Sequence, residues 1–159
     1  MSFFYRSTWS PTDRLMAALA ALVLAYASAL SVPATFWFDP GVPVVADSTV
    51  DASPAIGFER KIRRDVRIRY QVTVRRVDTL SPVCDPRSGV ITYRISAQLP
   101  EHLDLVWWTG GDRRCWPRAP GTYVMESCWE VVTPFWGLVP PKTVCRDSPP
   151  FRISGRAPA

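Results

Sequence analysis

The stretch that decides the fold is Val66-Arg67-Ile68-Arg69-Tyr70-Gln71-Val72-Thr73-Val74-Arg75. Apolar and polar side chains alternate along it without an exception. This period is typical of a β-strand that has one face on a core and the other face in solvent. The sequence therefore predicts a β domain built around this strand.

Four further short strands are expected, separated by turns rich in Pro and Gly. They occupy residues 91–97, 103–107, 123–131 and 151–153. This pattern is typical of an all-β sandwich. The run Ala119-Pro120-Gly121-Thr122-Tyr123 resembles the tyrosine-corner entry to the late strands of immunoglobulin-like sandwiches, although position 125 is Met where those domains carry Cys. The expected fold class is an immunoglobulin-like β-sandwich preceded by one N-terminal transmembrane helix.

Four cysteines are expected to form two disulfides in an oxidising compartment: Cys84, Cys115, Cys128 and Cys145. Three connectivities are possible, and the sequence alone does not choose among them. We favour Cys128 with Cys145 and Cys84 with Cys115, because the chain between the last two cysteines is long enough to turn and return beside Cys128. There is no C-x-x-C pair, and His102 has no companion at ligand spacing. We therefore expect neither a metal nor a cofactor.

Upstream of the β domain, residues 34–57 carry Pro and Gly at irregular intervals and are expected to form a linker. Before them, no Asp, Glu, Lys, Arg or His occurs between Arg14 and Asp39. Ser10-Pro11-Thr12-Asp13 is a helix start signal, and Pro33 disfavours helix at the residue before it. The predicted helix is long enough to cross a hydrocarbon core of about 30 Å.

This helix is either a retained membrane span or a cleaved signal peptide. The aromatic residues that flank it, Trp9 and Trp37 among them, favour the span, because Trp prefers the membrane interface. A signal peptide would instead be cleaved after Ala29 or Ala34. The N-terminal side of the helix carries Arg6 and Arg14 with one Asp13, whereas residues 33–58 carry three Asp and no Lys or Arg. The positive-inside rule then places the N-terminus in the cytoplasm, the helix in the inner membrane, and the β domain in the periplasm or outside the cell.

The predicted organisation is a cytoplasmic tail (1–10), a transmembrane helix or uncleaved signal anchor (11–33), the linker (34–57), a disulfide-bridged β-sandwich (58–155) and a short tail (156–159). This layout resembles small single-span membrane proteins of bacteriophages and prophages that carry an immunoglobulin-like β domain. The resemblance rests on the helix, on the strand at 66–74, and on the runs Pro120-Gly121-Thr122-Tyr123 and Pro150-Phe151-Arg152-Ile153. That family has no assigned activity, so the resemblance implies a fold and a location.

The net charge of +5 is concentrated in eight cationic residues between positions 60 and 76. Arg67, Arg69 and Arg75 share one face of the predicted strand and form a stripe that can hold phosphate or carboxylate groups. The alternative, which we favour, is an ordinary charged solvent face that prevents edge pairing. Besides the bilayer itself at residues 11–33, an envelope protein or an anionic surface is the expected partner, and nucleic acid is not expected.

The sequence contains no catalytic constellation that we recognise, since it has neither a G-x-S-x-G motif nor a Gly-rich phosphate loop. Glu126 and Glu130 fall on one face of the fourth strand and are interpreted as a solvent face. One or two tryptophans are expected on exposed loops, where they would mark a partner site or the membrane surface, among positions 107, 108, 116, 129 and 136. The expected function is a membrane-anchored extracytoplasmic binding or structural module rather than an enzyme. An envelope-acting hydrolase, or a secreted soluble domain after signal cleavage, is the alternative.

Overall fold

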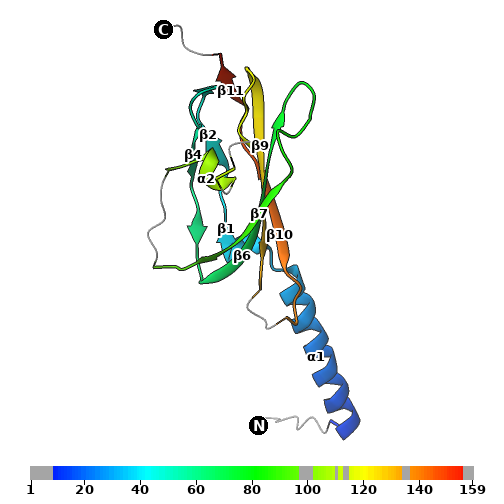
Figure 1. Ribbon diagram of the computed structural model, residues 1–159. Helices are drawn as coiled ribbons and strands as arrows, with labels where there is room; N and C mark the ends of the chain where they lie inside the picture. The colour runs from blue at the N-terminus through cyan, green and yellow to red at the C-terminus, as the bar shows by residue number, and fades with distance from the viewer. Residues whose placement is uncertain (1–8, 97–101, 110, 113–114, 134–136, 156–159) are drawn as a thin grey trace, which may run out of the picture. The chain divides into compact units, whose positions relative to one another are not determined.

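The computed structural model describes residues 9–96, 102–109, 111–112, 115–133 and 137–155. The chain divides into two compact units, the first ending at Val32 and the second beginning at Pro33. The described part of the first unit is dominated by one helix, and the second holds every described strand (Figure 1). We call the second one the β unit.

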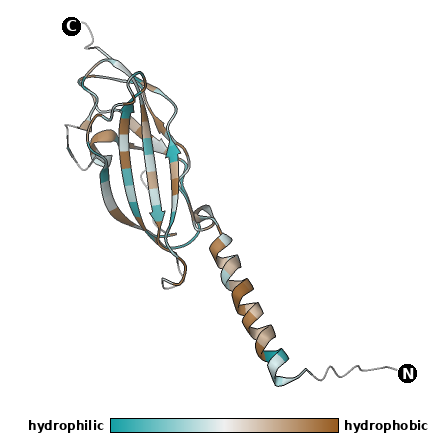
Figure 2. Ribbon diagram, turned by 90° about the vertical axis from the view of Figure 1, so that its right-hand side faces the viewer, coloured by the Kyte–Doolittle hydropathy of each residue, from teal (hydrophilic) through white to brown (hydrophobic). Residues whose placement is uncertain are grey.

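Helix α1, Pro11–Ser31, begins where the sequence predicts and ends two residues before the predicted bound at residue 33. The backbone N–H of Asp13 donates to the Ser10 hydroxyl at 3.1 Å, and the backbone N–H of Ser10 donates to the Asp13 carboxylate at 3.1 Å, which together form a capping box. Its 21 residues span about 31 Å, none of its side chains is buried, and it is apolar along most of its length (Figure 2). Both a membrane span and a signal sequence have this length and composition.

The longest strands build one sheet, the main sheet, around β9, Gly121–Val131. One edge of β9 pairs antiparallel with β6, Val66–Arg76, which pairs in turn with β7, Arg87–Tyr93. The other edge pairs with β10, Lys142–Asp147, and then with β11, Phe151–Ser154. Buried and more exposed side chains alternate along β9 and along most of β6, as the sequence predicts, so one face of the sheet covers a core.

A second sheet has three antiparallel strands in the order β2, Pro43–Val45, then β4, Ala55–Phe58, then β8, His102–Asp104. A short ribbon pairs β1, Phe38–Asp39, with β5, Lys61–Ile62. Val45 and Ile56 of the second sheet pack in one buried cluster with Val72 and Met125 of the main sheet. The core therefore lies between two β layers, an arrangement that is compatible with a β-sandwich.

Residues 34–57 are not a linker, and that prediction is wrong. They form the 3-10 helix η1, Ala34–Phe36, and the strands β1 to β4, of which β3 spans Ser48–Thr49. Phe38 and Ile56 are fully buried. Strands of two to four residues are too short to show a period, and these are held by pairing with distant segments, which a local pattern cannot reveal. The β unit thus begins at Pro33 rather than at residue 58.

The strand predicted at residues 103–107 is also corrected. Strand β8 stops at Asp104, and the chain continues as the short helix α2, Leu105–Trp108. The Asp104 carboxylate accepts a hydrogen bond from the backbone N–H of Trp107 at 2.7 Å, as an N-cap does. Three alternating apolar residues fit either structure, and the capping Asp favours the helix.

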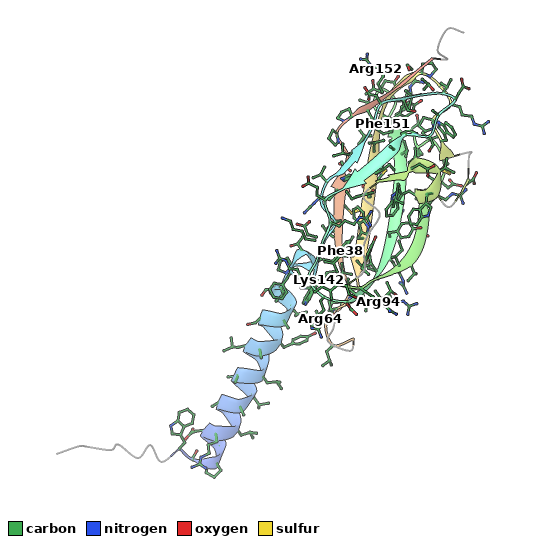
Figure 3. All side chains as sticks on the ribbon, turned by 90° about the vertical axis from the view of Figure 1, so that its left-hand side faces the viewer. Phe38, Arg64, Arg94, Lys142, Phe151 and Arg152 are labelled. Carbon is green, nitrogen blue, oxygen red and sulfur yellow. A yellow bond between two sulfur atoms is a disulfide. The ribbon has the colours of Figure 1, made fainter. Side chains whose placement is uncertain are left out.

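The β unit has two ends, which Figure 3 shows through the labelled residues at each. The end at which the chain arrives from Val32 is called the entry end. It consists of the described residues 33–41, 58–67, 92–96, 131–133 and 137–142. The opposite end is called the far end. It consists of residues 46–54, 75–84, 117–123 and 148–155. Strand β6 runs from one end to the other, and its 11 residues cover about 36 Å.

Candidate functional site

The three arginines of the predicted stripe lie on the outer face of β6, the face that points away from the core, and all three are exposed. Two of them are paired with the glutamates of β9, which share that face. Arg69 Nη1 lies 3.7 Å from Glu130 Oε1, and Arg75 donates a hydrogen bond to the Glu126 carboxylate. Arg67 is the member of the stripe that forms no ion pair with a described residue. The stripe is therefore largely a row of ion pairs.

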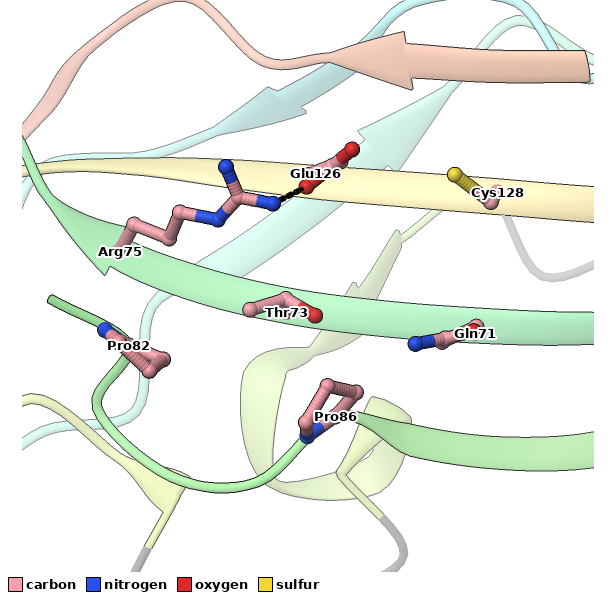
Figure 4. Close-up of a pocket in the computed structure, with 7 residues that line it drawn as sticks. All are labelled: Gln71, Thr73, Arg75, Pro82, Pro86, Glu126 and Cys128. Atoms are coloured by element: carbon pink, nitrogen blue, oxygen red, sulfur yellow. Dashed lines mark hydrogen bonds and ion pairs between the residues drawn. The ribbon is translucent and has the colours of Figure 1, made fainter. Parts of the chain in front are cut away.

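A hollow of about 270 Å³ lies on the outer face of the main sheet (Figure 4). We call it the outer hollow. Side chains of β6 and β9 form its floor, and two prolines from the segment between β6 and β7 form one wall. It is lined by Gln71, Thr73, Arg75, Pro82, Pro86, Glu126 and Cys128.

The floor of the outer hollow combines hydrogen-bond donors and acceptors with no net charge. It presents the amide of Gln71, the hydroxyl of Thr73, and the Arg75–Glu126 ion pair. A free phosphate would have to displace Glu126 from Arg75 and would be repelled by its carboxylate. The floor is thus better suited to hydroxyl and amide groups than to anions, and this argues against the stripe as a phosphate site.

The wall of the outer hollow is fixed by backbone pairing and by one disulfide. The backbone N–H of Val83 donates to the carbonyl of Val74 at 2.8 Å, and that of Arg76 donates to the carbonyl of Ser81 at 3.0 Å. Cys84 is bonded to Cys115, and Arg87 next to it forms an ion pair with Asp112. The prolines of the wall are therefore held in place relative to the floor.

Both disulfides have the connectivity that the sequence favoured, Cys84 with Cys115 and Cys128 with Cys145. Cys128 and Cys145 are directly opposite each other on β9 and β10, with their Cα atoms 4.0 Å apart. Cys128 also lines the outer hollow, so this bridge lies on the outer face. The described residues contain no free cysteine.

Arg60 lies among aromatic rings rather than in solvent, which the sequence did not predict. Its guanidinium carbon is 4.5 Å from the ring centre of Phe58, and 5.7 and 5.6 Å from those of Tyr93 and Trp108. Arg60 Nη1 donates to the Tyr93 hydroxyl at 3.4 Å, whereas the buried Nη2 has no hydrogen-bond partner among the described residues. In the sequence, Arg60 opens a run of charged residues that reads as a solvated segment.

Burial shifts the pKa of both groups in this contact. It lowers the pKa of the Arg60 guanidinium, because desolvation disfavours the charged form. It raises the pKa of the Tyr93 phenol for the same reason, and the nearby Arg60 only partly opposes that shift. At neutral pH the pair is thus a cation beside a neutral phenol.

The tryptophans fall into different environments. Trp9 is 51% exposed, whereas Trp37 is only 5% exposed, so the predicted place of Trp37 at the membrane interface is corrected. Trp37 lies in a segment that folds into the β unit, which the prediction of a linker had missed. Trp108 and Trp129 are buried and Trp107 is exposed, while Trp136 lies outside the described residues.

No group of three or more His, Cys, Asp or Glu side chains that would hold a metal ion occurs in the part of the chain that the structure describes. The side chain of His102 lies outside the description, although its backbone begins β8. Of the residues that line the outer hollow, the positions of Gln71 and Thr73 were predictable from the sequence, because alternation along the strand places them on the same face as the arginine stripe. The prolines of the wall were not, because the connection between β6 and β7 brings them there.

The chain matches no protein-family model, no curated protein and no solved structure.

Proposed function

We propose that this chain is a membrane-anchored, extracytoplasmic binding module that holds a polar, uncharged group of a partner protein in the outer hollow. The observation that carries the proposal is the floor of that hollow, where an amide, a hydroxyl and an internally neutralised ion pair lie on a rigid sheet. Such groups recognise peptide amides and hydroxyls by hydrogen bonds at low cost in ordering, because the strands already hold them in place.

An immunoglobulin-like fold for the β unit is part of the proposal. The order β2-β4-β8 opposite β11-β9-β6-β7 corresponds to the order A-B-E opposite G-F-C-C′ in variable-type immunoglobulin sandwiches. The Tyr123 hydroxyl donates to the carbonyl of Ala119 at 2.9 Å, as in a tyrosine corner. A departure is that Cys128 and Cys145 join two strands of the same sheet rather than the two sheets.

The location proposed for this module is the inner membrane, with the N-terminus in the cytoplasm and the β unit in the periplasm or outside the cell. Helix α1 supplies a segment of spanning length, and two disulfides suit an oxidising compartment. The resemblance to phage and prophage single-span proteins supports a role at the cell envelope. Secretion of a soluble β unit after signal cleavage is the alternative for the helix.

Site-specific photo-crosslinking in cells tests the binding site. A photoreactive phenylalanine analogue at Gln71, on the floor of the outer hollow, should form a defined adduct on illumination. The matched control carries the same analogue at Thr143, which is exposed on β10. The adduct from position 71 should be lost when Glu126→Gln disrupts the ion pair of the floor.

Equal adduct patterns from positions 71 and 143 would contradict the proposed site. The envelope hydrolase is tested separately, by incubating the purified chain with peptidoglycan and with phospholipid and looking for release of products. Turnover that survives Glu126→Gln would assign the activity elsewhere in the molecule and overturn the proposal of a pure binding module.

A further inference from the structure

Cationic side chains gather at the entry end of the β unit. The described residues of the entry end include seven Lys or Arg and three Asp or Glu. Those of the far end include four Lys or Arg and three Asp or Glu. Figure 3 shows Arg64, Arg94 and Lys142 at this end. Four of the arginines are exposed and form no ion pair with any described residue: Arg63, Arg64, Arg67 and Arg94.

Exposed apolar side chains occur at the same end. Phe36 is 57% exposed, Ile95 is 63% exposed and Leu138 is 70% exposed. Ile95 directly follows Arg94 in the chain, and Phe36 precedes the buried Trp37. A surface that combines exposed cations with exposed aromatic and aliphatic side chains has the composition of segments that lie at the membrane interface.

The fold assembles this surface from segments that are far apart in the sequence. The backbone N–H of Arg63 donates to the carbonyl of Trp37 at 3.0 Å, which places Arg63 beside η1. Val66 and Tyr93 are paired across β6 and β7, so Arg67 and Arg94, which follow them, lie at the same end of the sheet. Lys142 is opposite Val131 at that end of β10. The cations thus belong to the part of the β unit that adjoins Pro33.

We propose that the entry end is a second binding surface, which takes the anionic headgroups of phospholipids in the bilayer that α1 spans. The inference rests on the membrane anchoring of the proposed function and not on the outer hollow. Helix α1 ends at Ser31 and the β unit begins at Pro33, so with α1 in the bilayer only Val32 separates the end of the helix from Pro33, the first residue of the entry end. Guanidinium groups bind phosphate oxygens bidentately, and the apolar side chains enter the interface beside them.

The outer face of the main sheet does not have this character, because Arg69 and Arg75 are held by Glu130 and Glu126. The unpaired cations therefore favour the entry end over the stripe as the anion-binding surface. A lipid surface explains both components of the entry end, the cations and the exposed apolar side chains. A nucleic acid backbone would explain the cations alone.

Arginine footprinting on the full chain tests the proposal. The chain is reconstituted in vesicles of phosphatidylcholine alone and of phosphatidylcholine with phosphatidylglycerol, and the rate of arginine modification by phenylglyoxal is read by mass spectrometry. We expect Arg63, Arg64, Arg67 and Arg94 to react roughly fivefold more slowly in the anionic vesicles. Raised salt should remove the difference, because it screens the headgroup charge. Arg118 and Arg152 of the far end are internal controls and should react at the same rate in both.

A variant pair adds a second measurement. Arg63→Gln with Arg94→Gln should abolish the difference that remains at Arg67, whereas Arg118→Gln with Arg152→Gln, which removes the same charge at the far end, should leave it intact. Equal rates in both vesicles for firmly anchored protein overturn this surface alone, as does an equal slowing at Arg118 and Arg152. Release of the chain from the vesicles by alkaline carbonate overturns the anchoring, and with it both the proposed function and this inference.

Discussion

Arg60 is a cation that lies on aromatic rings, and its long side chain fills space that would otherwise be empty. The ring of Phe58 is its nearest aromatic neighbour, and the guanidinium retains one hydrogen bond, to Tyr93. Partial desolvation of this charge costs free energy. The packing of the aliphatic stem and the contacts with the rings offset that cost. Packing is therefore the main contribution of Arg60 to the stability of the β unit.

This account predicts different results for two truncations of Arg60. Arg60→Ala should lower the free energy of unfolding by about 2 kcal/mol, because it removes the packed stem. Arg60→Met should change it by less than about 1 kcal/mol, because Met fills similar space without a charge to desolvate. Urea unfolding of the full chain in detergent micelles, followed by tryptophan fluorescence, measures both. An equal loss for Met and Ala would show that the charge itself stabilises the fold.

The raised pKa of Tyr93 predicts a loss of stability at alkaline pH. In the folded state the phenol keeps its proton at a pH where the unfolded chain has already released it, at an ordinary pKa of about 10. Above that pH the unfolded state binds fewer protons, so the free energy of unfolding falls until the folded pKa is passed. The contribution of the protonated Tyr93 phenol to stability is therefore fully present below about pH 10.

Tyr93→Phe is the control for this prediction. The variant lacks the titrating phenol, so its free energy of unfolding should decline less between about pH 9 and pH 11 than that of the wild type. A parallel decline of the two proteins would assign the alkaline loss to other groups. The measurement is a series of urea unfolding curves across this pH range.

Among the strands, β7 depends on a close approach between its backbone and a ring of β6. A Cβ on Gly89 would lie 2.6 Å from Tyr70 Cε1, and the Tyr70 ring in turn packs edge-on against Trp108 at 5.2 Å. Gly89→Ala should therefore lower the free energy of unfolding by about 1–3 kcal/mol, because the ring has to move out of its packed position. Thermal unfolding monitored by circular dichroism gives the value.

Gly155→Ala is the matched control for Gly89→Ala. A Cβ at Gly155 would lie 3.9 Å from a side-chain carbon of Pro120, an ordinary contact. We expect its effect to stay within about 0.5 kcal/mol. If the two variants lost the same stability, the backbone rather than the Tyr70 contact would be responsible.

The two disulfides should restrain different parts of the β unit. Cys128 and Cys145 join strands that are already paired by backbone hydrogen bonds, whereas Cys84 and Cys115 join two segments outside the strands. Each bridge should contribute about 3–4 kcal/mol through the unfolded state, from sequence separations of 17 and 31 residues. Replacing Cys84 and Cys115 by Ala should also speed hydrogen exchange in residues 80–86, the segment that carries the wall of the outer hollow. Replacing Cys128 and Cys145 should leave that exchange unchanged, and a faster rate there would contradict this assignment.

The elements that the sequence predicted are those whose signal is local. Strands β6 and β9 each have 11 residues with one face on the core, so their alternation is long enough to be recognised. Strand β3 has two residues, and it is defined by pairing with β11 more than 100 positions later. Helix α2 depends on a single capping residue, Asp104. Long-range pairing and single caps are the features that a periodic pattern does not carry.

The candidate site divides in the same way. Parity along β6 places Arg67, Arg69 and Arg75 on one face from the sequence alone. The ion pairs with Glu126 and Glu130 depend on the register between β6 and β9, which the sequence does not specify. The entry end depends on five described segments that the fold brings together. Charge counted along residues 33–58 therefore missed the arginines that the fold gathers at the end of the β unit where Pro33 lies.

For the whole molecule, the proposed membrane span makes a direct prediction about the N-terminus. Protein isolated from its native host should begin at Met1 or Ser2, and protease added outside the inner membrane should digest the β unit after reduction while sparing the tail. A mature N-terminus at Leu30 or Thr35 would show signal cleavage, and it would contradict both the proposed membrane anchor and the proposed headgroup-binding surface.

The parallel pairing of β3 with β11 has a consequence for the proposed export of the β unit. Ser48 is opposite Ile153, and the backbone N–H of Arg152 donates to the Asp47 carboxylate at 2.6 Å. In the proposed topology the N-terminal side crosses first, so residue 48 emerges long before residue 153 and β3 stays unpaired until β11 has crossed. Such non-local contacts form late, because the intervening loop must close first. In that topology β3 is open to periplasmic proteases and chaperones until β11 arrives, so a product that stalls before residue 151 should be degraded rather than accumulate as a partly folded domain.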